Sequence, residues 1–189
     1  MAQKQDLTRK KKKQWFTIIA PKEFKEQVLA ETPALDIQEI KGRKLRINVM
    51  TLLGDPKKQN FAITFRVTSV EGTKGITQAI SYTMQNAYIK RVARKDCNKI
   101  DHVGIYELKD AKLKLKTLLI TKNKTHNSVL AKIRKETTKF LTEELKEMQS
   151  DKMFSTAISG SIQKSLREKL KKTYPIVVCD FRMIERVVD

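Results

Sequence analysis

The spacing of apolar residues changes once along this chain, and that change is the strongest constraint on its fold. In residues 44–50 and 61–67 apolar and polar side chains alternate, which is typical of half-buried β-strands. Beyond Ser128 the apolar residues recur with a period of 3.6, as they do on one face of an amphipathic helix. The order of strands first and helices later predicts an α+β fold.

The predicted strands and turns indicate a mostly antiparallel, barrel-like core with attached basic helices. Residues 14–189 are expected to form one globular domain, with a β-rich core over 14–122, helices over 128–173 and a returning strand over 176–188. Within the core, residues 37–83 are expected to form a run of strands that includes 44–50 and 61–67. Further strands are expected over residues 15–19, 102–108 and 113–121. Turn residues at 54–56 and from Gly72 to Gly75 separate strands. A helical turn over 23–30, ended by Thr32-Pro33, and a short basic helix over 87–95 are expected between them.

The helical region is expected to hold three helices. Their predicted N-caps are Ser128, Asp151 and Ser161, and Pro175 should end the last helix because its ring cannot continue the hydrogen-bond ladder. The apolar stripes of the first and third helices are Leu130, Ile133, Thr137, Leu141, Leu145 and Met148, and Ile162, Leu166 and Leu170.

The net charge points to a polyanionic partner. The chain has 40 Lys and Arg residues against 21 Asp and Glu, a formal net charge of +19. Self-repulsion of this size opposes compaction. Nucleic acid is favoured over an anionic membrane surface and over solubility alone, because each neutralised phosphate releases a condensed counterion. No run of eighteen apolar residues and no secretory signal occurs, so no membrane partner is expected.

The first thirteen residues hold six basic residues against one acid, Asp6. Such a block cannot bury apolar area, so we expect a disordered basic arm over residues 1–13. A phosphate-seeking arm is favoured over a merely solvated tail. Trp15 follows the arm and either stacks on an exposed base or fills the core at the start of a strand; the core interpretation is favoured.

Residues 109–139 concentrate the remaining charge, with ten basic residues against two acids. The helix after Ser128 is basic in its first half and acidic in its second, the reverse of the order that the helix dipole favours. Its start is therefore interpreted as a phosphate site together with the loop over 121–127, which offers Lys, Thr and Asn donors. The alternative is a solvated helix whose charges pair with a neighbouring helix. The basic face of the strand over 113–121 either contacts phosphates or protects an exposed sheet edge.

Residues for catalysis or metal binding form no recognisable set. The sequence has no Gly-rich phosphate loop, no clustered carboxylates and no Ser-His-Asp or Cys-His pair placed by a motif. Cys97, His102, His126 and Cys179 lack the close spacing of zinc ligands, and the two thiols fit a reducing compartment. We therefore expect no catalytic residue, no metal and no cofactor.

A diffuse basic surface fits structured RNA, which proteins recognise by shape and backbone. An RNA-processing enzyme and a free-standing mRNA-binding translation regulator are the alternatives.

Several short motifs occur in a fixed order along nearly the whole chain. They are Lys13-Gln14-Trp15-Phe16 with Ala20-Pro21 and Phe24, Lys41-Gly42-Arg43, Leu52-Leu53-Gly54-Asp55, Ile120-Thr121-Lys122 with Lys124-Thr125, Ile133-Arg134-Lys135, and Ser161-Ile162 with Tyr174-Pro175. In this order they resemble the small-subunit ribosomal protein family of archaea and eukaryotes called S-one-e or S-three-A-e. The chain stops at Asp189 without the long basic extension of eukaryotic relatives, which suggests the archaeal form. The turn Leu53-Gly54-Asp55 is less acidic than is common in relatives.

The resemblance implies a structural, non-enzymatic constituent of the small ribosomal subunit, docked on ribosomal RNA at the platform near the mRNA exit. The implied partners are small-subunit ribosomal RNA, neighbouring ribosomal proteins and mRNA near the exit, in the cytoplasm and without homo-oligomerisation. Charge placement, supported by the resemblance, gives the candidate RNA-binding residues. They are Arg9, Lys10, Lys11, Lys12, Lys13, Lys41, Arg43, Lys90, Arg91, Arg94, Lys122, Lys124, Arg134 and Lys135.

Overall fold

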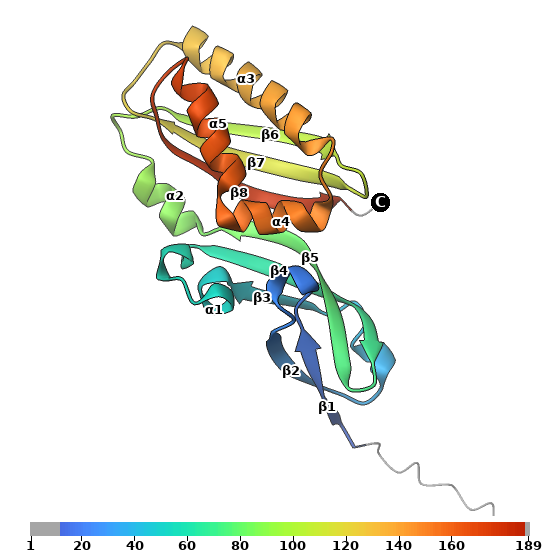
Figure 1. Cartoon of the computed structure of the whole chain (residues 1–189). Coiled ribbons are helices and arrows are strands. Elements are labelled where there is room, and N and C mark those ends of the chain that lie inside the picture. The colour runs from blue at the N-terminus through green and yellow to red at the C-terminus, as the bar shows by residue number, and fades with distance from the viewer. Residues whose placement is uncertain (1–11, 188–189) are drawn as a thin grey trace, which may run out of the picture.

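The structure is a computed structural model that describes residues 12–187, except for the side chain of Ile37 (Figure 1). The strands are β1 (Gln14–Ile19), β2 (Val28–Ala34), β3 (Lys44–Asn48), β4 (Phe61–Glu71), β5 (Lys74–Met84), β6 (Lys99–Glu107), β7 (Lys112–Thr121) and β8 (Ile176–Val187). The helices are α1 (Val49–Leu53), α2 (Asn86–Val92), α3 (Asn127–Leu145), α4 (Ser150–Ser159) and α5 (Ser161–Lys171), with short 3-10 helices η1 (Lys22–Phe24), η2 (Ile37–Glu39) and η3 (Pro56–Lys58). The expected disordered arm lies outside the described residues, except for Lys12 and Lys13, which are exposed.

All eight strands belong to one sheet. Its order is β2-β1-β5-β8-β7-β6, and β4 and then β3 branch from β5. β1 runs parallel to β5, whereas the other pairings are antiparallel. The α+β prediction is confirmed. The sheet does not close into a barrel, because no strand of the described chain pairs with the outer edges of β2, β3 or β6.

Strand β5 joins the two parts of the molecule that Figure 1 shows one above the other. Its first residues pair with β1 and most of its length pairs with β4, whereas Ser81–Thr83 pair with β8. The main hydrophobic core runs through both parts and includes Phe65 on β4 and Leu113 on β7. A smaller cluster between β1, β2 and β4 consists of Phe16, Ile18, Ala34, Ile40 and Val67. The predicted alternation in residues 61–67 is confirmed, since Phe61, Ile63, Phe65 and Val67 are all buried.

Helices α3, α4 and α5 lie on one face of the β6-β7-β8 part of the sheet (Figure 1). The predicted stripe of α5 is buried, and so is that of α3 up to Leu145, with Phe140 in addition. Met148 lies beyond the end of α3 but still packs against the core.

The predicted N-caps of these helices are wrong. α3 begins one residue earlier than Ser128, after His126, without a side-chain cap. Gly160, at φ 81°, precedes α5, so Ser161 is already helical. Asp151 lies in the first turn of α4, and the cap comes from a distant turn of the chain: Asp110 accepts hydrogen bonds from the N–H of Ser150 at 2.9 Å and from its hydroxyl.

The hydrogen bonds of this cap change the pKa of the Asp110 carboxyl group. Burial alone would raise the pKa of Asp110, but the hydrogen bonds from Ser150 and the positive charge of Arg186 outweigh it and hold the pKa below 3.8. A capping group must lie within hydrogen-bond distance of the first amides of its helix. Asp110 reaches that position only because α4 packs on the β6–β7 turn, so the sequence alone could not identify this cap.

The N-terminal half departs from the sequence predictions at three places. The helical turn expected over 23–30 is only η1, since Lys25 and Glu26 have positive φ angles and β2 starts at Val28. Pro33 does not break the chain but lies within β2, because an outer strand tolerates a missing donor. The strand expected over 44–50 stops at Asn48, whose side chain accepts the N–H of Met50 and caps α1.

Candidate nucleic-acid interface

Three loops meet at the end of the sheet where α3 begins (Figure 1). They are the loops of residues 93–98, 122–126 and 172–175. The N–H of Asn98 donates to Thr121 Oγ1 at 2.9 Å, and the N–H of Thr121 donates to Asn98 O at 3.1 Å. The N–H of Lys122 donates to Pro175 O at 3.0 Å. These bonds hold together segments that are far apart in the sequence.

The three loops and the end of α5 present six basic side chains, which we call the basic loop end. They are Arg94, Lys95, Lys122, Lys124, Lys171 and Lys172. All six are exposed, and none forms an ion pair with another described residue. The only acid in the three loops is Asp96. Free cations held on loops of fixed geometry are suited to phosphate oxygens.

The first half of α3 continues this basic surface. Its first turn contains no acidic residue. Lys132, Lys135 and Lys139 are exposed and, at 100° per residue, share the side of α3 that faces solvent. None of the three pairs with a described carboxylate. The loop–helix junction therefore presents lysines from two elements on one end of the molecule.

Two glutamates of α3 have partners on α5 or just after it. Glu143 forms an ion pair with Lys169 at 3.4 Å, and Glu136 accepts a hydrogen bond from Thr173 Oγ1 at 2.7 Å. The alternative interpretation of the reversed charge order, charge pairing with a neighbouring helix, is thus correct for Glu143, whereas Glu136 accepts from an uncharged hydroxyl just after α5. It does not account for the lysines of the first half of α3.

The basic helix predicted over 87–95 is present as α2, but it ends at Val92, so Arg94 and Lys95 lie in the following loop. The cations of α2 itself differ in availability. Arg91 lies over the ring of Tyr88 at 5.4 Å and donates to Asn60 Oδ1 at 3.4 Å. Lys90 is exposed and has no such partner. Arg134, on α3, is exposed and lies close enough to His102 for its charge to influence that imidazole.

Arg43 has a structural role that its motif did not reveal. Its guanidinium donates to Thr32 Oγ1 at 2.6 Å, to Pro33 O at 3.1 Å and to Glu39 O at 3.0 Å. These bonds tie the start of β3 to β2 and η2. Lys41, two residues earlier, is exposed.

β1, which follows the arm in the sequence, and the basic loop end lie at opposite ends of the molecule (Figure 1). Arg9, Lys10 and Lys11 fall outside the described residues. The core interpretation of Trp15 is wrong, because 65% of this residue is exposed. Phe16 and Ile18 take the inward positions of β1, so strand alternation turns Trp15 outward.

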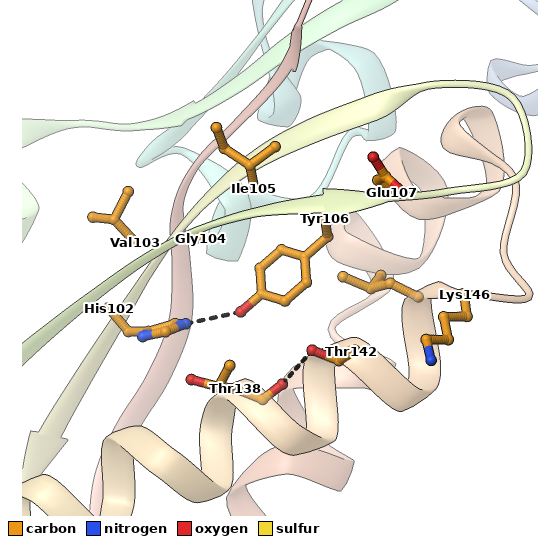
Figure 2. Close-up of a pocket in the computed structure, with 10 residues that line it drawn as sticks. His102, Val103, Gly104, Ile105, Tyr106, Glu107, Thr138, Thr142 and Lys146 are labelled. Carbon is orange, nitrogen blue, oxygen red and sulfur yellow. Dashed lines mark hydrogen bonds between the residues drawn. The ribbon is translucent and has the colours of Figure 1, made fainter.

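A groove of about 530 Å³ runs between β6 and α3 and contains His102 (Figure 2). His102 Nε2 lies 2.8 Å from Tyr106 Oη, and Thr138 and Thr142 line the opposite wall. Burial, assisted by the charge of Arg134, lowers the pKa of His102, whereas burial raises that of Tyr106. A hydroxyl is the only described hydrogen-bond partner of the imidazole, so this pair lacks the carboxylate that orients a catalytic histidine.

The four residues considered as a zinc set do not come together. Among residues 12–187 no group of three or more His, Cys, Asp or Glu side chains is placed to hold a metal. Cys97 donates to Lys122 O at 3.3 Å within the basic loop end, whereas Cys179 is buried on β8. In the same part of the chain, no helix is both long and apolar enough to cross a membrane.

The sequence prediction missed Lys171 and Lys172, although the two adjoin each other in the sequence. The Lys171-Lys172 pair just before Pro175 was the available signal. Only the hydrogen bond from Lys122 to Pro175 shows that this pair belongs beside the loop after β7.

Fold and charge together define a class: a small, strongly basic α+β protein with a group of exposed, unpaired cations at one end of an open sheet. The model of the ribosomal S3Ae family matches residues 2–187. Small ribosomal subunit protein eS1 of Sulfurisphaera tokodaii is 32% identical over 167 residues, which cover 88% of this chain and 86% of that protein. The eS1 protein of Methanopyrus kandleri is 31% identical over 180 residues, 93% of this chain and 85% of that protein. That of Saccharolobus islandicus is 29% identical over 167 residues, 88% of this chain and 80% of that protein.

The chain belongs to the ribosomal S3Ae family. The family resemblance seen in its motifs is therefore confirmed, and so is the archaeal form, because these relatives are archaeal proteins. Membership makes the chain a ribosomal protein, a structural component and not an enzyme.

Proposed function

We propose that this protein is a structural constituent of the small ribosomal subunit and that it binds ribosomal RNA through the basic loop end. The observation that carries the proposal is the set of six exposed cations, free of ion pairs, on loops that hydrogen bonds hold together. The relatives named small ribosomal subunit protein eS1 support the assignment to that subunit.

The arrangement favours recognition of the RNA backbone over recognition of bases. Lysine offers a point charge to phosphate, and the loops add hydroxyl and amide donors from Asn123 and Thr125. The finer parts of the proposal are a position at the platform near the mRNA exit, contacts with neighbouring ribosomal proteins and mRNA, and residence in the cytoplasm. They follow from the family resemblance.

Removal of charge from the basic loop end tests the proposal. Replacement of Lys95, Lys122, Lys124 and Lys172 with Ala leaves the backbone hydrogen bonds of the loops in place. Each lost phosphate contact should reduce the slope of log K against log salt by about 0.7–0.9, so four should reduce it by about 3. Binding of small-subunit ribosomal RNA is measured by filter retention over a salt series.

A matched control removes four exposed lysines elsewhere: Lys22, Lys57, Lys152 and Lys164. These lie on η1, η3, α4 and α5 and form no ion pair with a described residue. The control has the same net charge as the loop variant and should keep the wild-type slope. If both variants gave the same slope of log K against log salt, the basic loop end would not be part of the RNA interface.

Assembly is tested separately by sedimentation. Wild-type protein should remain on small subunits washed at high salt, in one copy per subunit, and the loop variant should be released at lower salt. Recovery of the wild-type protein only with free mRNA would instead support a translation regulator.

A further inference from the structure

The face of the sheet that points away from α3, α4 and α5 is open across several strands. Register pairs place Arg46 opposite Thr64, Thr64 opposite Ser81 and Ser81 opposite Glu185. Glu185 lies opposite Lys114 on β7. Directly opposite residues of an antiparallel sheet have side chains on the same face. One row therefore runs from β3 to β7, and at about 4.8 Å per strand it spans about 19 Å.

Cations from three strands converge in a depression on this face. Its volume is about 310 Å³, and Arg46 of β3, Lys116 of β7 and Arg182 of β8 line it. Thr64 and Thr83 complete the polar part of the wall, and no carboxylate lines it. Positive groups that surround a concave surface without acids focus an attractive potential for anions.

Most of the cations on the open face are not used within the protein. Lys44, Arg66, Lys114 and Lys116 form no ion pair with a described residue. Lys114 and Lys116 are nevertheless half-buried. Because β7 lies between β6 and β8, these lysines do not protect a sheet edge, and that interpretation of the strand is wrong. Two cations of this face do have partners in the protein. Arg182 lies 3.9 Å from Asp101, whose closer partner is Lys99 at 2.7 Å, and Arg46 donates to Thr83 Oγ1 at 3.4 Å.

The chemistry of the face selects one kind of polyanion. Sheets that bind single strands stack bases on aromatic side chains, and no aromatic residue lines the depression. The neighbouring depression around Arg66, about 420 Å³ in volume, is lined by Lys41, Thr68 and Gln78 among others and also lacks aromatic residues. Cations, hydroxyls and amides suit a sugar-phosphate backbone presented by a rigid duplex.

We propose that this open face, centred on Arg46, Lys116 and Arg182, is a second RNA-binding surface that takes the backbone of double-helical RNA. The inference rests on the proposed function for the identity of the polyanion as RNA. It is independent of the basic loop end, which lies on loops and helix ends, whereas these cations lie within strands. The protein thereby contacts RNA on two surfaces.

The test compares the variant R46Q/K116Q/R182Q with wild type on two probes: a double-helical RNA of about 20 base pairs and a single-stranded poly(U) of similar length. Loss of three phosphate contacts should reduce the salt slope for the duplex by about 2–3 and leave that for poly(U) unchanged. An equal reduction on both probes would overturn the duplex assignment, and an unchanged duplex slope would overturn the surface.

A second measurement does not depend on the folding of a variant. Acetylation of the wild-type protein by an N-hydroxysuccinimide ester reports which lysines are covered when the duplex is bound. Lys114 and Lys116 should be protected, whereas Lys22 and Lys57 should keep their reactivity. Unchanged reactivity of Lys114 and Lys116 in the complex would overturn the proposal.

The two proposals fail in different ways. If the wild-type protein does not bind ribosomal RNA, or if the basic loop end variant binds as wild type does, the proposed function fails. If wild type binds and R46Q/K116Q/R182Q binds with the same slope, only the second surface fails. Normal RNA binding by this variant, combined with its loss from small subunits, would show that a protein covers the face and would overturn the inference.

Discussion

Replacement of Asp180 by Asn should stabilise the protein, and the gain should depend on pH. Asp180 lies on β8 between the buried residues Cys179 and Phe181, and its carboxylate has no hydrogen bond or ion pair with a described residue. Burial raises the pKa of this group from 3.8 to about 6, although Lys58 and Arg167 lower it in part. The folded protein therefore carries a poorly solvated carboxylate at neutral pH.

The magnitude follows from the difference between the folded and unfolded pKa. One pKa unit corresponds to about 1.4 kcal/mol, so a rise from 3.8 to about 6 corresponds to about 3 kcal/mol. A carboxyl group with a raised folded pKa costs stability when it is ionised. The cost is absent below pH 3.8, grows as the pH rises towards 6, and is complete above 6.

Urea unfolding followed by circular dichroism, at about pH 4 and about pH 8, measures both ends of this range. Asp180→Asn should match wild type in unfolding free energy at the lower pH and exceed it by up to about 3 kcal/mol at the higher pH. Asp96→Asn, at an exposed loop position, is the control and should match wild type at both. A difference between Asp180→Asn and wild type that is the same at both pH values would refute the reasoning.

Three further expectations concern other sites. Gly104→Ala should lower the unfolding free energy by about 1–3 kcal/mol in urea titrations, because the new Cβ would lie 2.7 Å from the ring of Tyr106; wild-type stability would show that the ring moves freely. One thiol, Cys97, should react with Ellman's reagent in the native protein and two in denaturant, since burial raises the pKa of Cys179 to about 12; two native thiols would contradict this. Acrylamide should quench the fluorescence of Trp15 nearly as well in the folded as in the unfolded protein, and strong shielding in the folded state would place Trp15 inside.

The elements that local periodicity defines were predictable, because a side chain's face within a strand or helix depends only on its position in that element. The buried faces of β4 and α5 are examples, and so is the basic helix α2. Helix starts were less predictable. Ser128 and Ser161 are good capping residues by type, yet α3 and α5 begin earlier, and the group that caps α4 is Asp110 from another turn.

The residues of the candidate site also differ in whether the sequence alone could identify their role. The loop lysines Lys122 and Lys124 could be found from charge alone, and the structure leaves both exposed and unpaired. Arg43 could not be judged from its motif, because its partners on β2 and η2 become neighbours only when the chain folds.

By itself the sequence determined the α+β class, the family and the large positive charge, since each depends on residue types and on their spacing along the chain. The tertiary structure alone decided that the sheet stays open, that Trp15 points to solvent, and that Arg46, Lys116 and Arg182 line one depression. The physical reason is that strand pairing over long sequence separations sets which faces meet. The spacing of apolar residues within β1, β5 and β8 does not indicate that β1 pairs in parallel with β5, or that β5 pairs over a short stretch with β8.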